Sequence, residues 1–213
     1  TLSLHDALPI SPALRSSNSP KNVEICVAGI LCQVLDELQT VPNEVIDTLL
    51  AQFLPKNVKH KPASYRLAVD VCTATSDRLQ RHVCQYFAEV ITSTIAGSRE
   101  SDESEEDTKK GAGKAALPAS FVSAHTLIKQ VNRSVPSLLL NVIPQLEEEL
   151  QAEKPEYRKL AAEVLGAMFG EKTGQGDLAA KYPGTWKEWI GRLKDKVPAV
   201  RRSEEHTSEL QSQ

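Results

Sequence analysis

Residues 124–150 read AHTLIKQVNRSVPSLLLNVIPQLEEEL, residues 157–172 read YRKLAAEVLGAMFGEK, and residues 186–201 read WKEWIGRLKDKVPAVR. In the first two blocks apolar residues recur at positions i, i+3, i+4 and i+7, and proline or glycine interrupts them at regular intervals. This spacing is typical of amphipathic helices that stack against one another in pairs.

The same periodicity extends upstream and predicts further helices. Pro144 lies inside one of them, where it pushes against the carbonyl of Leu140 and predicts a kink. The first helix carries an apolar stripe of Val23, Val27, Ile30, Leu31, Val34 and Leu38 on one face. The predicted helices start at or near Pro20, Pro42, Pro62, Ser76, Ser120, Pro136, Pro155 and Thr185.

The helix pairs open at regular distances along the chain. The openings at Pro20, Pro62, Ser120 and Pro155 are 42, 58 and 35 residues apart, and the middle interval is 36 without the 22-residue segment 97–118. HEAT and armadillo pairs have this spacing. We therefore expect an all-α fold, a HEAT/armadillo-like α-solenoid of about four helix pairs in which neighbouring pairs stabilise each other.

Both ends of the chain resemble translated sequencing-library adapters. Residues 1–10 and 202–213 are therefore interpreted as artefacts and set aside, which leaves helical repeats at 11–96 and 119–201. Without these ends the net charge changes from −3 to 0, so no overall field attracts or repels nucleic acid. The charged residues involved are Asp6, Arg202, Glu204, Glu205 and Glu209.

Residues 97–118 read GSRESDESEEDTKKGAGKAALP, a polar segment that is acidic at its centre. Such a composition buries too little apolar surface to offset the entropy of ordering, which predicts a disordered acidic loop between repeats. Ser104 precedes Glu105, Glu106 and Asp107, a pattern that predicts a phosphorylation acceptor for an acid-directed kinase.

The composition also indicates a compartment. No apolar run approaches the roughly 20 residues that span a bilayer, so no membrane association is expected. Cys26, Cys32, Cys72 and Cys84 lie within apolar helical patterns, where small buried thiols rather than disulfides are expected. The sequence therefore favours a reducing compartment, the cytoplasm or the nucleus.

No constellation of residues predicts catalysis, a cofactor or a metal, so the site predictions are empty and a binding scaffold is expected. Glu147, Glu148 and Glu149 are interpreted as a solvated helix face, His125 as a satisfied or partly exposed histidine, and Trp186 with Trp189 as a buried contact between repeats. Two basic clusters are interpreted as solvated loops, with direct contact to DNA or an inositol polyphosphate left open. They are Lys56, Lys59, Lys61 and Arg66, and Lys187, Arg192, Lys194, Lys196 and Arg201.

Three short sequence motifs resemble those of a known protein family. The segments VIPQLE at 142–147, LGAMFG at 165–170 and WIGRLKDK at 189–196 resemble the sister-chromatid-cohesion family named for precocious dissociation of sisters, in a fungal-like form. Residues 62–68 and 76–80 resemble it more weakly. The acidic segment 97–118 and the connector 174–176 depart from the family pattern, and both lie between helices.

This resemblance implies a non-enzymatic helical-repeat regulator of cohesin that supports sister chromatid cohesion in mitosis. It further implies binding to the kleisin subunit of cohesin and to the release factor Wapl, indirect association with chromatin, and a nuclear location. No functional residue of the family can be placed at a position of this chain. The alternative is another HEAT-repeat adaptor, such as a nuclear transport receptor or a condensin subunit.

Overall fold

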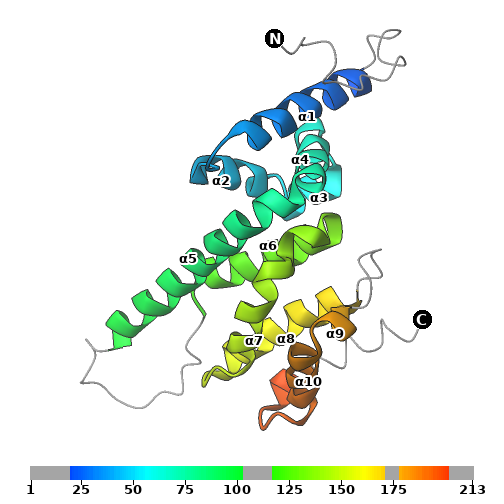
Figure 1. The fold of residues 1–213 in the computed structure, drawn as a ribbon. Coiled ribbons are helices and arrows are strands. Elements are labelled where there is room, and N and C mark those ends of the chain that lie inside the picture. Colours follow the sequence, from blue (N-terminus) through cyan, green and yellow to red (C-terminus); the bar gives the residue numbers. More distant parts are fainter. Residues whose placement is uncertain (1–19, 103–116, 171–177, 202–213) are drawn as a thin grey trace.

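The structure is a computed structural model that describes residues 20–102, 117–170 and 178–201, and every regular element in these ranges is helical (Figure 1). The adapter-like ends, 1–10 and 202–213, and Ser104 lie outside the described residues. The α-helices are α1 (Pro20–Glu37), α2 (Asn43–Ala51), α3 (Pro55–His60), α4 (Ala63–Ala74), α5 (Ser76–Asp102), α6 (Ala119–Ser134), α7 (Ile143–Leu150), α8 (Pro155–Gly170), α9 (Leu178–Lys181) and α10 (Pro183–Gly191). Two 3-10 helices lie among them, η2 (Pro136–Val142) and η3 (Arg192–Lys194), and residues 198–201 are also helical.

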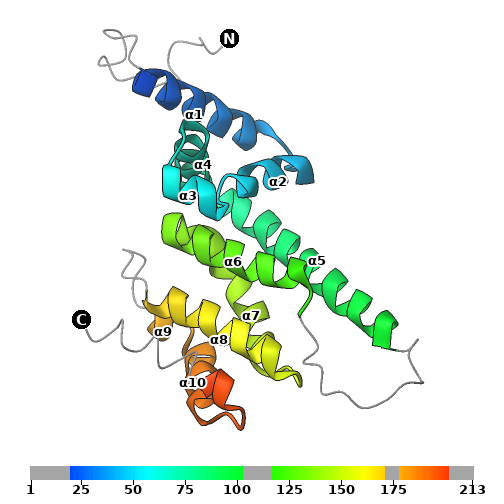
Figure 2. The same ribbon diagram turned by 180° about the vertical axis from the view of Figure 1, so that it is seen from behind.

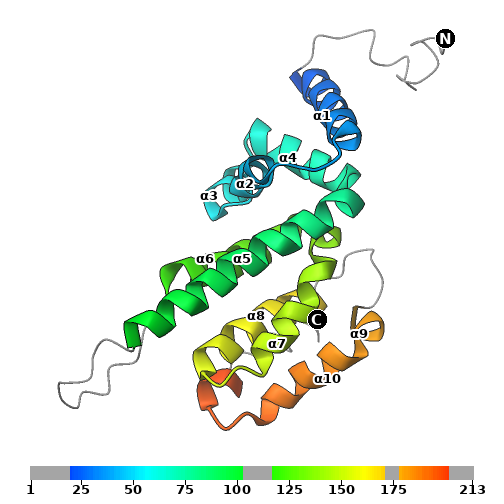
Figure 3. The same cartoon turned by 60° about the vertical axis from the view of Figure 1, so that its left-hand side comes forward.

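The helices form an elongated stack that runs from α1 at one end to α10 at the other (Figures 1 and 2). Near the middle, α5 and α6 lie side by side, and α7 and α8 form the next layer (Figure 3). Helix α6 contacts both α5 and α8, and α10 contacts α7 and α8. This arrangement confirms the predicted α-solenoid, in which each layer is covered by its neighbours.

The hydrophobic core follows the stack from layer to layer. Phe121, Ile128 and Val131 of α6 are fully buried, as are Leu146 of α7 and Val164 of α8. The helical periodicity therefore predicts the packed faces correctly in the second half of the chain, where each helix has a neighbour on both sides.

Most of the apolar stripe predicted for the first helix stays outside the core, and only Leu38, just after α1, packs against it. Val23, Ile30 and Val34 are 58%, 62% and 49% exposed, whereas Ala28 and Leu35 are buried. At about 100° per residue, the exposed stripe lies roughly a quarter to a third of a turn away from the buried face. Helix α1 thus has two apolar faces, of which only one is covered, and periodicity alone does not tell them apart.

The first helix pair also differs from the expectation. Helix α1 packs mainly on α4 and α2 packs on α5, so α1 and α2 do not form the predicted first helix pair. A further short helix, α3, replaces the predicted basic connector. Pro55 at its first turn supplies a helix-compatible φ, and Lys61 ends it in the left-handed region (φ 48°) with its N–H bonded to Asn57 O.

The kink predicted at Pro144 takes the form of a change in helix type. Residues 136–142 form η2, and the α-helical hydrogen-bond pattern begins only at Ile143. Because Pro144 has no N–H, it cannot donate to the carbonyl of Leu140, four residues earlier. The hydroxyl of Tyr182 donates to that carbonyl instead, at 3.3 Å, and connects it to the segment that precedes α10.

The segment predicted as a loop from Gly97 begins as helix. Helix α5 continues past Gly97 to Asp102, and α6 begins again at Ala119. The polar composition of this segment predicts a loop, but a helix that has already formed gains one backbone hydrogen bond for each residue added to its end. Helix α5 can therefore extend through serine, arginine and glutamate residues. Residues 103–116 lie outside the described residues, so the acidic loop remains a prediction there.

Candidate protein-interaction site

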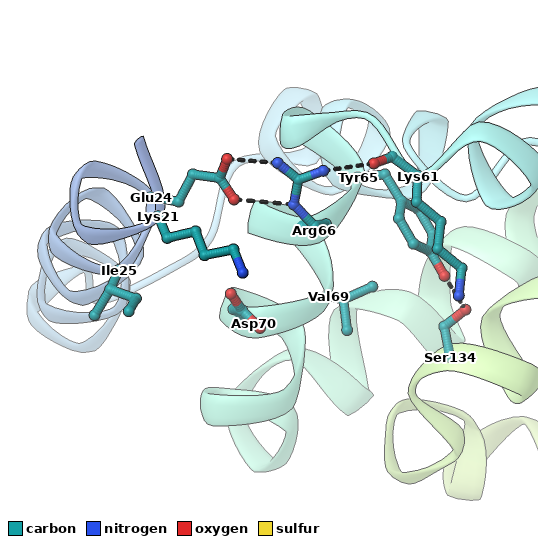
Figure 4. Close-up of a pocket in the computed structure, with 9 residues that line it drawn as sticks. All are labelled: Lys21, Glu24, Ile25, Lys61, Tyr65, Arg66, Val69, Asp70 and Ser134. Carbon is teal, nitrogen blue, oxygen red and sulfur yellow. Dashed lines mark hydrogen bonds and ion pairs between the residues drawn. The ribbon is translucent and has the colours of Figure 1, made fainter. Parts of the chain in front are cut away.

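A groove of about 430 Å³ opens between α1 and α4 (Figure 4). It exists because α1 crosses α4 at the end of the stack and leaves one side of α4 uncovered. The side chains that line it are Lys21, Glu24, Ile25, Lys61, Tyr65, Arg66, Val69, Asp70 and Ser134. The groove therefore combines charges of both signs with apolar surface, a composition suited to a protein partner.

An arginine on α4 connects the two walls of the groove. Arg66 donates through Nε and Nη2 to the two carboxylate oxygens of Glu24, at 3.0 and 2.6 Å, and through Nη1 to Lys61 O at 2.7 Å (Figure 4). These hydrogen bonds lower the pKa of Glu24 and raise the pKa of Arg66. The pair orients α1 on α4, and the two side chains neutralise each other, so Arg66 is not free to act as an isolated cation.

A buried tyrosine forms the floor of the groove. The Tyr65 hydroxyl and Ser134 Oγ are 2.8 Å apart, which joins α4 to the end of α6. The Tyr65 ring also meets Phe53 edge to face, with centroids 5.8 Å apart. Both contacts hold the floor in place while the rim remains open to solvent.

Replacing Tyr65 by phenylalanine is expected to lower the free energy of unfolding by about 0.5–1.5 kcal/mol, because the ring still packs while one partly buried hydrogen bond is lost. Urea unfolding followed by circular dichroism measures the change. Ser134→Ala is the matched variant, and the double variant should lose less than the two single losses combined. Fully additive losses would show that the two side chains do not interact.

The first predicted basic cluster is split by the structure. Lys56 and Lys59 are exposed on α3, Lys61 is exposed at its end, and Arg66 is held by Glu24. The exposed Lys56 and Lys59 therefore lie outside the groove, whereas the exposed Lys61 lines it. This agrees with a solvated surface kept soluble by charge.

The second predicted basic cluster surrounds one buried aspartate. Arg158 of α8 donates to both carboxylate oxygens of Asp195, at 2.8 and 3.1 Å, and Arg192 donates to Asp195 Oδ2 at 3.3 Å. The N–H of Val197 donates to Oδ1, and Arg201 donates to the Asp195 carbonyl. The two arginines of the cluster thus stabilise the turn after η3. Its three lysines, Lys187, Lys194 and Lys196, are exposed.

The Asp195 cluster makes stability depend on acid pH. The hydrogen bond from Arg158, aided by Val197 N–H and by the charge of Arg192, lowers the pKa of Asp195 from 3.8 to about 2 even though burial opposes the shift. A depressed carboxylate pKa stabilises the fold above pH 3.8, and this contribution is lost as the pH falls through about 2. We expect the difference in unfolding free energy between wild type and Asp195→Asn to shrink by about 2 kcal/mol over that interval. A difference independent of pH would contradict the assignment.

The three consecutive glutamates do not form one solvated face. Only Glu148 is exposed, whereas Glu147 accepts a hydrogen bond from the Thr185 hydroxyl and Glu149 is buried. Helical geometry turns the third carboxylate toward α6, where Glu149 Oε2 lies 2.6 Å from Nε2 of the buried His125. The interpretation of Glu149 as solvated is therefore wrong, because a buried histidine on the facing helix supplies its partner.

The prediction of a buried tryptophan contact is confirmed for Trp189, whereas Trp186 is half-buried. Trp189 is 2% exposed, its indole N–H donates to Ala162 O at 2.9 Å, and its ring lies 5.7 Å from that of Phe169. Trp186 meets Phe169 edge to face at 5.0 Å. These rings join α10 to α8 and are part of the stack rather than an exposed platform.

The cysteines are free, as predicted, but not equally buried. Cys72 is buried, which raises the pKa of its thiol to about 12. Cys32 and Cys84 are half-buried, and burial raises the pKa of each. Cys26 is exposed, which corrects the expectation of burial, because it lies on an uncovered side of α1.

Among the described residues, no group of three or more histidine, cysteine, aspartate or glutamate side chains could hold a metal ion. In the same part of the chain, no helix is both long and apolar enough to cross a bilayer.

Sequence reasoning did not find the α1–α4 groove or its ion pair. A usable signal exists, because Tyr65-Arg66 and Tyr157-Arg158 stand at matching positions near the starts of α4 and α8. In both pairs the tyrosine is buried, and the arginine donates to the carbonyl five residues earlier. The carboxylate partners, Glu24 and Asp195, come from opposite directions along the chain and could not be read from the repeat.

This chain is similar to known proteins in both sequence and fold. The family described as "Sister chromatid cohesion protein PDS5 protein" matches residues 10–206. The chain is 33% identical over 199 residues to the sister chromatid cohesion protein pds5 of Schizosaccharomyces pombe, a match that covers 88% of this chain and 15% of that protein. Identity to PDS5 of Saccharomyces cerevisiae is 27% over 185 residues, covering 82% of this chain and 13% of that protein.

A chain in a solved structure of a Pds5–Scc1 complex matches with a TM-score of 0.70 and 24% identity, over 92% of this chain and 29% of that one. The fold is thus shared with that protein. The present chain spans 13–15% of the length of the two yeast relatives it matches.

Proposed function

The chain belongs to the PDS5 family of sister chromatid cohesion proteins, and on this basis we propose that it is a segment of a helical-repeat scaffold that binds cohesin and regulates its residence on chromatin. The observation that carries the proposal is the family match over residues 10–206, together with a helical stack shared with the chain from the Pds5–Scc1 complex. The alternative of a nuclear transport receptor or condensin subunit is not favoured, because the matching family is PDS5.

The partner that this proposal names first is the kleisin subunit of cohesin. Its support is the shared fold of a relative solved in complex with Scc1, and the presence here of surfaces that suit a protein segment. The α1–α4 groove offers apolar wall next to paired charges, and an extended stack of helices can bind a partner along its length.

Three further elements complete the proposal. The longer polypeptide to which this segment corresponds binds the release factor Wapl, is located in the nucleus and associates with chromatin through cohesin. A scaffold role, without catalysis, is part of the proposal, and ion pairs such as Arg66–Glu24 and Arg158–Asp195 support it by joining elements of the stack. Residues 11–96 and 119–201 act as two parts of one repeat array.

Affinity purification tests this function in cells. The tagged chain, produced in Schizosaccharomyces pombe, is expected to enrich the cohesin kleisin subunit several-fold over an untagged control. Ile190→Ala, a substitution at an exposed side chain that leaves charge unchanged, is the matched control and should enrich kleisin as well as the wild-type chain does. Failure to recover kleisin with a folded wild-type chain, by quantitative mass spectrometry, would count against the proposal.

A further inference from the structure

Helix α1 presents a continuous apolar stripe to solvent. Residues four, three and four positions apart along the helix share this side of it, as in a helix that packs against another helix. No charged residue occurs between positions 25 and 35. A contiguous exposed apolar face marks an interaction surface, because a solvated helix face normally carries charges. The exposed side chains of the stripe are Val23, Val27, Ile30 and Val34, with Cys26 and Leu31 at its edges.

The stripe is accessible to a partner. Helix α1 lies at one end of the described stack and packs mainly on α4 (Figures 1 and 2). Its buried side chains, Ala28 and Leu35, lie on a different side of the helix from the stripe. A partner can therefore cover the stripe without displacing the contact between α1 and α4.

The two ends of α1 carry charges opposite to those that the helix itself favours. Its first turn contains Lys21 and no acidic residue, whereas Asp36 and Glu37 stand in its last turn, which has no basic residue. The N-terminus of a helix is partially positive and its C-terminus partially negative, so both charges interact unfavourably with their own helix. A second helix that lies antiparallel removes this conflict if its own N-terminal end is basic.

The stripe is also nearly the same when read in either direction. Its midpoint lies between Ala28 and Gly29, with Val23 and Val34 equally far from that point, and with Val27 and Ile30 closer to it on either side. An antiparallel copy of α1 centred there sets each valine of the outer pair against its counterpart, and Val27 against Ile30. It also places the acidic end of each helix beside the basic end of the other. Such self-complementarity is what a two-fold symmetric interface requires.

We propose that this face of α1 is a self-association surface, on which a second copy of this chain packs its own α1 in the antiparallel direction. The two apolar stripes cover each other, and Glu37 of each copy lies near the first turn of the other. A single helix pair is a small interface, so the dimer is weak and depends on concentration. The proposal goes beyond cohesin binding, because it uses neither the α1–α4 groove nor a kleisin.

Sedimentation velocity of the purified full chain tests the proposal. Between about 1 and 300 micromolar, the sedimentation coefficient is expected to rise from that of a monomer toward that of a dimer. Ile30→Glu is expected to weaken the dimer at least about tenfold, because it places two carboxylates within the paired stripes. Val122→Glu is the matched control. It makes the same charge change at an exposed apolar side chain of α6 and should leave the dimer unchanged.

A charge reversal at the end of α1 tests the antiparallel direction. Glu37→Lys is expected to weaken the dimer about two- to fivefold, because an attraction to the basic end of the second copy becomes a repulsion. In a parallel pair, like charges meet at this position before and after the substitution. An unchanged dimer would therefore contradict the antiparallel arrangement.

Three further results would overturn the proposal, given circular dichroism that shows each variant folded. A chain that stays monomeric over the whole concentration range does not use the stripe for self-association. If that monomer recovers less kleisin when it carries Ile30→Glu, the stripe belongs to the kleisin instead. Equal weakening of a dimer by Ile30→Glu and Val122→Glu would place the interface elsewhere or show general charge repulsion.

Discussion

Replacing Trp189 by alanine is expected to lower the free energy of unfolding by about 3–5 kcal/mol, the range for removing a fully buried large aromatic side chain. Trp189 is 2% exposed and packs against Phe169 and Trp186, so the substitution leaves a cavity between α8 and α10. It also removes the donor to the carbonyl of Ala162. Urea unfolding monitored by circular dichroism gives the change in free energy.

Ile190 provides the control for this experiment. It is adjacent in sequence but 39% exposed, so Ile190→Ala should change the unfolding free energy by no more than about 1 kcal/mol. Similar effects of the two substitutions would mean that α10 does not pack on the stack through Trp189. A loss limited to the signal of the C-terminal helices, with the rest unfolding later, would still agree with stabilisation between neighbouring layers.

Arg158→Met is expected to lower the free energy of unfolding by about 2–4 kcal/mol. The substitution leaves a buried carboxylate with fewer hydrogen-bond partners and removes the donor to two backbone carbonyls. Arg158 is paired with Asp195, whose side chain is 4% exposed, and it also donates to the carbonyls of Ala152 and Glu153. One guanidinium thus joins the start of α8 to the turn after η3. Thermal and urea unfolding of the purified variant measure the loss.

The neighbouring lysine is the matched control. Lys159 is 46% exposed and forms a helical i,i+4 ion pair with Glu163 at 3.8 Å, so Lys159→Met should change the free energy of unfolding by about 0.5 kcal/mol or less. If Arg158→Met and Lys159→Met changed the free energy of unfolding equally, the Asp195 cluster would not stabilise the fold.

The apolar periodicity of the sequence predicts the buried face of a helix best where the helix has one apolar face and neighbours on both sides. The helix predicted from Pro155 is present over Pro155–Gly170, and Trp189 lies in the core because apolar side chains share its face. The same reasoning fails for α1, where Val23 and Ile30 belong to an apolar face that no described residue covers. A sequence pattern shows that a face is apolar, but which faces meet depends on the packing of distant helices.

Polar contacts within the stack were the least predictable feature. Glu149 stands in a run of glutamates that is typical of a solvated face, yet His125, on a helix that precedes it in the chain, turns it inward. Glu24 and Arg66 are 42 residues apart and meet only because α1 crosses α4. Each candidate site is built from such long-range contacts, which explains why the sequence indicated a scaffold without indicating its grooves.

Titration calorimetry of the purified chain with the purified kleisin subunit of cohesin measures whether this segment binds cohesin. We expect saturable binding with one kleisin per chain and a dissociation constant of about micromolar or tighter. The absence of binding at about 100 micromolar, from a chain whose circular dichroism and unfolding transition show the helical stack intact, would contradict it.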